Sequence, residues 1–357
     1  MVRPIIELTT PVEDDRPIYL VGNFNNWEIS EKEYQLEKKG DNLYCFHFNE
    51  DQELTWPLEY KFVKENWEGV EADIHGGGVQ NRVLKNKIPI IKNHVPRWFI
   101  GGKAFKEEFL PHRIKIAEDF VLPQLNRTRR LWALLPHDYY TSQKRYPVVY
   151  LQDGQNLFNP NGTFGNWAID ERLAVLAETN QHEYIIIAVD HAGKERISEY
   201  SPYNTHIISK SNGRKYVQFI SQTLKPFIDD QFRTMPGRNH TCIGGSSLGG
   251  LISIYAGLIY PAIFGRLMIF SPSLWLSPKI YFDAIDFGKL QDTKVYLYGG
   301  NKESKTMVDN LGRLNKAFQT ADEHVKFEVK MSIDKFGEHS ESYWGREFPK
   351  AIKWLFE

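Results

Sequence analysis

The segment TCIGGSSLGG at residues 241–250 constrains the fold more than any other part of this 357-residue chain. It predicts a buried strand over 241–243, a sharp turn, and a helix over 248–260. Gly245, Ser247 and Gly249 occupy the turn in the pattern G-x-S-x-G, which is the pattern of a nucleophile elbow. There a strained backbone pushes the serine hydroxyl out of the turn, and the glycines allow strand and helix to pass closely.

The residues around this pattern make it more specific than its letters alone. Glycine and serine are common enough that roughly one chain in ten of this length contains G-x-S-x-G by chance. After Ser247, apolar residues recur at the three-and-four spacing of a helix with one buried face, and Pro261 ends it. The free N–H groups at the start of such a helix point back at the turn, where an oxyanion could form.

Length and charge set the broad class of the protein. A chain of 357 residues is long enough for two domains, and 41% hydrophobic with 25% charged residues is ordinary for a globular protein. The formal net charge of −1 provides no basic surface for nucleic acid or for an anionic membrane. No apolar run approaches the roughly 20 residues of a membrane span. The sequence leaves the oligomeric state open.

Cysteine content and the first residues indicate the compartment. Cys45 and Cys242 fall in apolar runs of different predicted domains, so a disulfide framework is excluded. Residues 1–7 lack the apolar core and cleavage site of a secretory signal. We therefore expect a cytoplasmic protein, although a leader removed earlier would leave the same pattern.

The chain divides by pattern into two domains. Residues 1–92 contain short alternating or apolar strands near 18–21, 43–48, 58–63 and 79–84, which predict a small all-β sandwich. Residues 93–107, with Pro96, Gly101 and Gly102, are predicted to be a linker. From 108 to 357 strands and helices alternate, which predicts a doubly wound, mostly parallel α/β sheet covered on both faces, the α/β-hydrolase architecture.

A serine nucleophile needs a histidine base and an acid that orients it, and in this fold both follow the serine in the chain. Only His324 and His339 lie beyond Ser247. His339 falls in the loop between the last predicted strand and helix, whereas His324 begins a strand and is expected to be structural. Glu303 follows a strand that ends in glycines and is the favoured acid; Asp309, inside a helix, is its competitor.

An oxyanion requires two N–H donors. The first is expected from Leu248, the residue after the nucleophile. The second is expected from Gln155, in the loop after the first central strand, where Gly154 lets the backbone turn. Asp153 precedes the serine, so we expect it to shape the loop rather than act as the acid.

Six motifs occur in order over residues 108–357: YPVVYLQDGQNLF, GNWAIDE, GKERISEYSPY, GGSSLGG, YLYGGNKES and HSESYWGREFP. Together they resemble the Putative esterase family, which includes esterase D, enterochelin, feruloyl and acetyl-xylan esterases, and mycolyltransferases. The run from His339 resembles the mycolyltransferase histidine motif, and Glu303 matches the position of their catalytic glutamate. The resemblance implies a serine carboxylic-ester hydrolase that needs no metal or other cofactor.

The front domain resembles another kind of module. GNFNNW, LEYKFVKENWEGVEAD and NRVL are similar to the carbohydrate-binding modules of glycogen-branching enzymes. Such modules stack exposed aromatic rings on sugars. Trp67 is the favoured glycan contact, with Trp27 and Trp56 as alternatives. Many modules of this kind have lost glycan binding and only shape a neighbouring active site, and the sequence leaves that choice open.

Substrate identity is left to loop residues and to the resemblance. Trp167, Arg196, Tyr203 and Trp275 fall in loops expected near the serine and could line a pocket. The resemblance together with the front domain favours a small-molecule or oligosaccharide ester, with feruloyl or acetyl groups on carbohydrate. The first alternative is a siderophore trilactone esterase. A catalytically silent glycan-binding protein is the alternative from another class.

Overall fold

The protein folds into two compact units. The computed structural model describes residues 3–11, 14–29, 32–86, 88–159, 165–179, 183–286, 293–320 and 327–357. The first unit comprises residues 1–107 and the second residues 108–357. Each unit has hydrophobic cores of its own.

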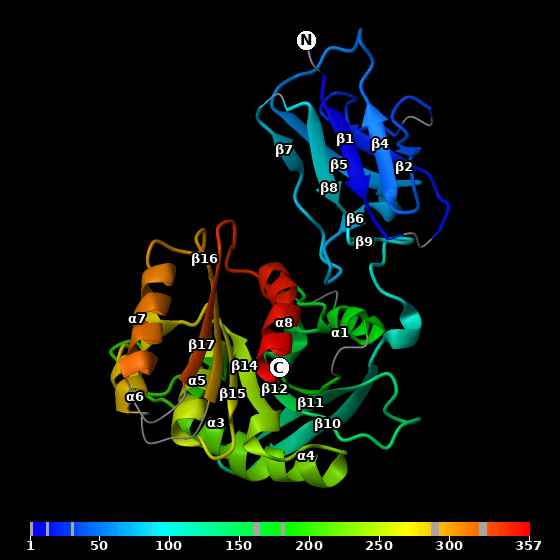
Figure 1. The fold of residues 1–357 in the computed structure, drawn as a ribbon. Coiled ribbons are helices and arrows are strands. Elements are labelled where there is room, and N and C mark those ends of the chain that lie inside the picture. The colour runs from blue at the N-terminus through cyan, green and yellow to red at the C-terminus, as the bar shows by residue number, and fades with distance from the viewer. Residues whose placement is uncertain are drawn as a thin grey trace. The chain divides into compact units, whose positions relative to one another are not determined.

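The first unit is built from short strands that form two main sheets around one core (Figure 1). One sheet has the order β3-β4-β1-β8 and the other β2-β5-β7, with β6 and β9 paired separately. Leu8, Leu20 and Phe62 are fully buried in the core. The strands are β1 Ile5–Thr9, β2 Ile18–Gly22, β3 Glu37–Lys38, β4 Leu43–His47, β5 Leu58–Lys64, β6 Glu71–Ala72, β7 Arg82–Leu84, β8 Ile90–His94 and β9 Arg97–Trp98.

Residues 93–107 do not form the predicted linker. β8 pairs in parallel with β1, so the chain at 93–94 is still part of the first sheet. Trp98 is only 2% exposed and its indole N–H donates to Thr10 Oγ1 at 2.8 Å. Burial of this large ring stabilises the segment against the first unit more than its proline and glycine residues favour an open linker. Residues 93–107 therefore belong to the first unit.

The second unit contains the sheet order β10-β11-β13-β12-β14-β15-β16-β17. β11 runs antiparallel to both neighbours, and the pairs from β13 through β17 are parallel. This is the α/β-hydrolase architecture expected from the alternation of strands and helices. The strands are β10 His112–Leu122, β11 Arg127–Leu135, β12 Val148–Gln152, β13 Ile185–Val189, β14 Thr241–Ser246, β15 Arg266–Phe270, β16 Thr293–Gly300 and β17 Phe327–Asp334.

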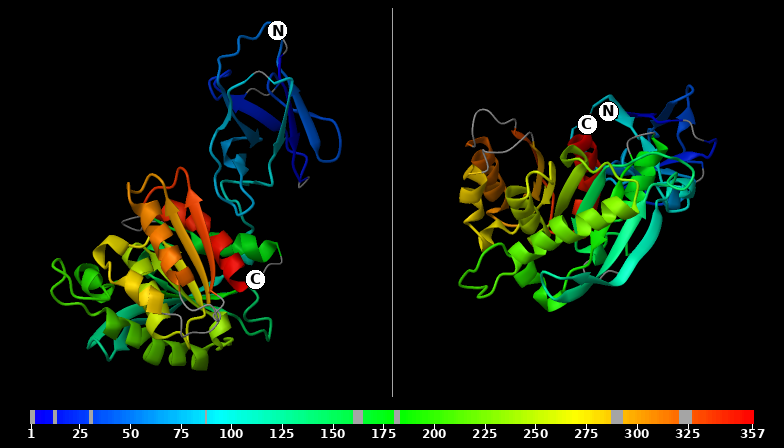
Figure 2. Two further views of the ribbon diagram at one scale, coloured as in Figure 1. Left: turned by 60° about the vertical axis from the view of Figure 1, so that its left-hand side comes forward. Right: turned by 90° about the horizontal axis from the view of Figure 1, so that it is seen from below.

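Helices cover both faces of this sheet, as Figures 1 and 2 show from three directions. Side chains of α1 and α8 enclose one core with Val149 and Leu151 of β12. Val148 and Tyr150, which point to the opposite face, pack with the remaining long helices. The helices are α1 Ile169–Glu178, α2 Arg196–Glu199, α3 Gly213–Phe219, α4 Lys225–Gln231, α5 Leu248–Ile259, α6 Ile280–Asp286, α7 Met307–Thr320 and α8 Glu341–Phe356.

A π-helical turn at Ile220–Leu224 joins α3 to α4 just before Pro226, a residue type that disrupts regular helical hydrogen bonding. None of the helices within the described ranges combines the length and apolarity needed to cross a membrane.

Close packing of α8 against the start of α1 predicts a stability difference between two glycines. A Cβ at Gly345 in α8 would lie 2.1 Å from the carbonyl oxygen of Trp167, so Gly345→Ala should destabilise the protein by about 1–3 kcal/mol. Gly312 in α7 has no neighbour within 4 Å of that position. Gly312→Ala should stabilise by about 1 kcal/mol through helix propensity. Urea denaturation checks both, and equal effects would contradict this packing.

Candidate active site

Ser247 lies on a strained turn between β14 and α5. Its φ of 56° and ψ of −120° fall in a region that costs a non-glycine residue about 1–3 kcal/mol. The turn is tight because strand and helix are almost in contact. A Cβ at Gly245 would lie 3.0 Å from the carbonyl carbon of Gly249, and a Cβ at Gly249 would lie 3.0 Å from Gln152 Cβ. Both glycines are therefore required by close approach.

The loop after β15 contacts the Ser247 hydroxyl. Ser247 Oγ lies 3.2 Å from Ser273 Oγ, and the N–H of Ser273 donates to the carbonyl of Ser247 at 3.0 Å. The N–H of Ser247 in turn donates to the carbonyl of Phe270 at 2.9 Å. Among the hydrogen bonds of the described residues, none joins Ser247 to His339.

Glu303 and His339 form a close pair at the same edge of the sheet. His339 Nδ1 lies 2.7 Å from Glu303 Oε2, and the side chain of the glutamate is only 1% exposed. The other carboxylate oxygen accepts the Ser271 hydroxyl at 2.7 Å and the N–H of Gly300 at 2.6 Å. The carboxylate is therefore held on both oxygens, which fixes the imidazole that it contacts.

The His339 loop is fixed against the loop after β16. The N–H of Lys302 donates to the carbonyl of Gly337 at 3.0 Å, and a Cβ at Gly300 would lie 2.1 Å from that carbonyl oxygen. The His339 ring packs edge-to-face on Trp344, with centroids 4.9 Å apart. The indole N–H of Trp344 donates to Ser271 Oγ at 2.9 Å. Trp344 thus links the histidine to the residue that holds Glu303.

Chain topology explains why these residues meet. Ser247, Ser271, Glu303 and His339 follow β14, β15, β16 and β17, which are consecutive neighbours in the parallel part of the sheet. Their carboxyl ends lie at one edge, where ligands bind in open α/β sheets. The side chain of His339 is 41% exposed, so solvent reaches the imidazole.

The two expected oxyanion donors have free N–H groups. Within the described residues, the backbone N–H of Leu248 and that of Gln155 donate no hydrogen bond. Leu248 begins α5, where no earlier helical carbonyl is in reach. Gln155 lies in the short 3₁₀ turn Gly154–Asn156, and the neighbouring Gln152 touches the elbow glycines. Both N–H groups are available for an added acceptor.

The competing acid does not take the place of Glu303 beside His339. Asp309 lies in the first turn of α7, whereas Glu303 makes the hydrogen bond to His339. His324 lies outside the described residues.

The four loop residues expected to line a pocket have different surroundings. Trp167 is 3% exposed and stacks on Phe270 at 5.4 Å, so its ring belongs to the core and the pocket prediction for it is wrong. Tyr203 donates its hydroxyl to Asp283 Oδ2. Arg196 is paired with Asp153 at 2.7 Å. Trp275 is 65% exposed and lies two residues after Ser273.

The tryptophans of the front unit also differ in exposure. Trp67 is 46% exposed, whereas Trp27 and Trp56 are half-buried. Trp56 packs against the core of that unit. Of the three rings, Trp67 offers the largest free face.

Sequence reasoning missed Ser271, Ser273 and Trp344. Ser271 is fully buried and has a φ of 44°, and it follows β15 directly. Ser271 could have been predicted from its position, because a small polar residue immediately after a buried parallel strand lies at the same sheet edge as the nucleophile. Trp344 stood inside the histidine motif but was not assigned a contact.

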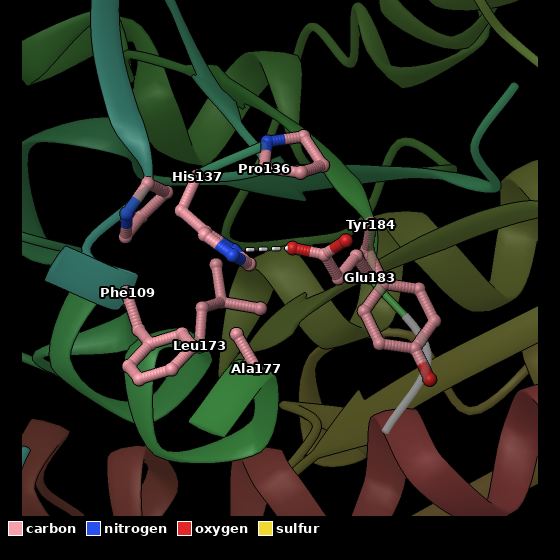
Figure 3. A pocket seen from close by; sticks show the side chains of 8 residues that line it. Phe109, Pro136, His137, Leu173, Ala177, Glu183 and Tyr184 are labelled. Atoms are coloured by element: carbon pink, nitrogen blue, oxygen red, sulfur yellow. Dashed lines mark ion pairs between the residues drawn. The ribbon is translucent and has the colours of Figure 1, made fainter. Parts of the chain in front are cut away.

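One group in the described residues has the composition of a metal site. Ligand atoms of His137, Asp138 and Glu183 all lie within 4.8 Å of one another, a set that sequence spacing could not reveal. Figure 3 shows His137 and Glu183 in their pocket, joined at 2.7 Å. They lie after β11 and before β13, at the edge opposite Ser247. The ammonium of Lys144, 2.6 Å from Asp138, already supplies positive charge there.

Glu341, the first residue of α8, is the titratable group near His339 with a shifted pKa. Burial raises its pKa above the ordinary value of 4.5, and the nearby Asp153 acts in the same direction. Its own N–H, His339 and Arg196 oppose the shift. The carboxylate accepts a hydrogen bond from Asn156 Nδ2 at 3.3 Å.

Comparisons with known proteins show the family and the fold of this chain. The model of the Putative esterase family matches residues 123–355. The uncharacterized protein YbbA of Bacillus subtilis (strain 168) is 25% identical over 240 residues, which cover 64% of this chain and 92% of YbbA. A ferulic acid esterase structure is 18% identical with a TM-score of 0.53, over 70% of this chain and 98% of its own. The enterobactin esterase FES of Shigella flexneri is 15% identical with a TM-score of 0.54, over 99% and 92% respectively. At these identities the two structures show a shared fold.

The raised pKa of Glu341 predicts how stability changes with pH. The folded state holds the Glu341 proton more tightly than the unfolded state does, so ionisation costs stability as pH rises from 4.5 through the folded pKa. Glu341→Gln removes this cost. The unfolding free energy of the variant relative to wild type should therefore increase across that window and stay constant at lower pH. Denaturation at several pH values measures it; an unchanging difference would show that the carboxyl titrates normally.

Proposed function

This chain belongs to the Putative esterase family and is a carboxylic ester hydrolase, and from that premise we propose that Ser247, His339 and Glu303 form its catalytic triad. The observation that carries the proposal is the 2.7 Å contact between His339 Nδ1 and a buried glutamate at the edge where Ser247 turns. A carboxylate on Nδ1 leaves Nε2 as the base that faces a nucleophile.

The reaction is acyl transfer in two steps. His339 Nε2 accepts the Ser247 hydroxyl proton as Oγ attacks the ester carbonyl carbon, and the carbonyl oxygen becomes an oxyanion. When the C–O bond of the ester breaks, His339 returns the proton to the leaving alcohol. Water then attacks the acyl-serine with His339 as base again, which releases the acid and restores Ser247. Before attack, the Ser247 hydroxyl must direct its hydrogen toward His339 Nε2, while its oxygen lies 3.2 Å from Ser273 Oγ.

The free N–H groups of Leu248 and Gln155 are proposed to bind the oxyanion. Such donors are already oriented before the reaction, so they stabilise charge that develops only in the transition state. Glu303 contributes by stabilising the imidazolium and by holding its ring orientation. Both of its carboxylate oxygens are fixed, by His339 on one side and by Ser271 and Gly300 on the other.

We propose that the substrate is an ester with an aromatic acyl group linked to carbohydrate, with feruloyl esters as the leading candidate. Trp275 supports the aromatic group, because its 65% exposed ring follows Ser273, which contacts the nucleophile. Flat aromatic acids stack on such a ring more favourably than an acetyl group does. The front unit, whose sequence is similar to glycan-binding modules and which exposes Trp67, supports the carbohydrate part.

A catecholate trilactone is the second candidate. The enterobactin esterase structure aligns with 99% of this chain, the front unit included. The aromatic rings of a catecholate trilactone would stack on the same exposed Trp275 ring. A panel of feruloyl-oligosaccharide and trilactone esters separates the two candidates by their kcat/KM values.

The alternative from another class, a glycan-binding protein without catalysis, does not agree with the match to the esterase family. The cytoplasm is the proposed compartment, because both Cys45 and Cys242 are free and buried.

The triad assignment predicts large losses of activity in three variants. Ser247→Ala and His339→Ala should each lower kcat for p-nitrophenyl acetate by about 10⁴-fold or more, and Glu303→Gln by less. Ser342→Ala, which removes an exposed hydroxyl from the same region, is the control and should retain full activity. Steady-state kinetics with p-nitrophenyl acetate measures these kcat values. Hydrolysis by Ser247→Ala at the wild-type rate would show that Ser247 is not the nucleophile.

The aromatic surface predicts a selective loss in Trp275→Ala. KM for a feruloyl ester should rise about 3- to 10-fold, whereas KM for an acetyl ester should change little, because only the aromatic acid stacks on the ring. Tyr140→Ala is the matched control: this ring is 64% exposed but follows β11 at the opposite edge of the sheet. Equal effects on both esters would argue against acyl-group recognition by Trp275.

A further inference from the structure

The loop after β12 adopts a conformation that needs external support. Asp153 has φ 60° and ψ 49°, the left-handed region that is unfavourable for a residue with a side chain. Gly154 follows, and a Cβ there would lie 2.6 Å from Asp190 Oδ1. The loop then turns through Gln155 and Asn156. Its backbone therefore carries strain close to the N–H group proposed for the oxyanion.

Arg196 provides that support from α2. Its Nε and Nη2 atoms donate to Asp153 Oδ1 and Oδ2, both at 2.7 Å, in a bidentate pair. Asp153 is 5% exposed, and the guanidinium lies 5.2 Å over the ring of the fully buried Tyr200. Burial acts to lower the pKa of Arg196, but the hydrogen bonds and charge of Asp153 outweigh it and raise that pKa.

Gln155 is held from the other side of the loop. Its side-chain amide accepts the N–H of His191 at 2.9 Å and donates to the carbonyl of the same residue at 3.1 Å. Both polar atoms of the side chain thus have a partner, whereas the backbone N–H of Gln155 has no acceptor in the described residues. These contacts orient that N–H group before any substrate arrives.

The charge of Asp153 would oppose catalysis if it stood alone. Asp153 Oδ2 lies 3.1 Å from the Cβ position of Gly249, the second residue of α5, and the residue itself is two positions before Gln155. A bare carboxylate so close to the proposed oxyanion donors would repel the negative charge of the transition state, more strongly in a site with little water. The guanidinium of Arg196 neutralises the Asp153 charge by contacting both carboxylate oxygens.

We propose that Arg196 is a positioning residue of the esterase: its bidentate pair with Asp153 holds the loop that presents the Gln155 N–H group, and neutralises the carboxylate beside the oxyanion. This inference rests on the proposed triad chemistry. It also replaces the sequence-based assignment of Arg196 to the substrate pocket, because two of its nitrogen atoms are already committed to Asp153.

Kinetics of four variants tests the proposal. Arg196→Gln should lower kcat by about 10- to 100-fold with KM within about 2-fold, because it weakens transition-state binding only. Arg196→Lys, which keeps the charge but loses the bidentate geometry, should lose less. The double variant Asp153→Asn with Arg196→Gln should be more active than Arg196→Gln alone, since the unpaired charge is gone. Lys144→Gln, which breaks the ion pair with Asp138 at the opposite edge, is the control and should be unaffected.

Three outcomes would each overturn the proposal: wild-type kcat in Arg196→Gln, a double variant no better than that single one, or unchanged hydrogen exchange over residues 152–157 in the Arg196 variants. If Arg196→Gln does not fold, Arg196→Lys decides by whether kcat falls while KM is kept. Hydrogen exchange over residues 152–157 separates this inference from the proposed function. Faster exchange in the Arg196 variants supports positioning even if wild type shows no Ser247-dependent hydrolysis, whereas unchanged exchange rejects it.

Discussion

The hydrogen bond between His339 Nδ1 and Glu303 Oε2 at 2.7 Å is the contact on which the site depends. It connects the loop after β16 to the loop after β17, which are also joined by the backbone hydrogen bond from Lys302 to Gly337 and by the Lys302 ammonium over the Phe336 ring. The side chain of the glutamate is 1% exposed, so its charge is stabilised by Ser271, the Gly300 N–H and the imidazole rather than by water. A buried carboxylate with these partners can hold a histidine in one orientation and stabilise it when it becomes protonated.

The parallel sheet brings the site residues to one edge, and the tight turns after the strands orient their side chains. Consecutive parallel strands end at one edge, which brings Ser247 and His339 to the same edge although 91 residues lie between them in the chain. Three polar residues there have positive φ angles: Asp153, Ser247 and Ser271. Each is held by named contacts, Asp153 by Arg196, Ser247 by Phe270 and Ser273, and Ser271 by Glu303 and Trp344. Hydrogen bonds therefore hold these three residues in strained backbone conformations. This arrangement is expected where the geometry of a site must be fixed before the reaction.

Much of the architecture was predictable from the chain, and the reasons for the exceptions are physical. The α/β-hydrolase fold is confirmed by the family match and by the sheet order. It was predictable because apolar runs and helical periodicity repeat over 250 residues, so that local and tertiary preferences agree. The roles of Ser247, Glu303 and His339 follow from chain order and stay a prediction. Trp167 was misplaced because an aromatic residue in a loop has the same local pattern whether it faces a pocket or stacks on Phe270. Ser271 and the Arg196–Asp153 pair were not foreseeable in detail, because their contacts join segments that are more than 30 residues apart.

Covalent labelling tests the central claim most directly. A fluorophosphonate reacts only with a serine whose hydroxyl is activated by a base and whose developing oxyanion is stabilised. Peptide mass spectrometry of the labelled protein should place one adduct on Ser247, and His339→Ala should slow its formation by several orders of magnitude. An adduct on Ser271 or Ser273 instead, or labelling of Ser247 at the same rate without His339, would contradict a serine activated by this histidine and its buried glutamate.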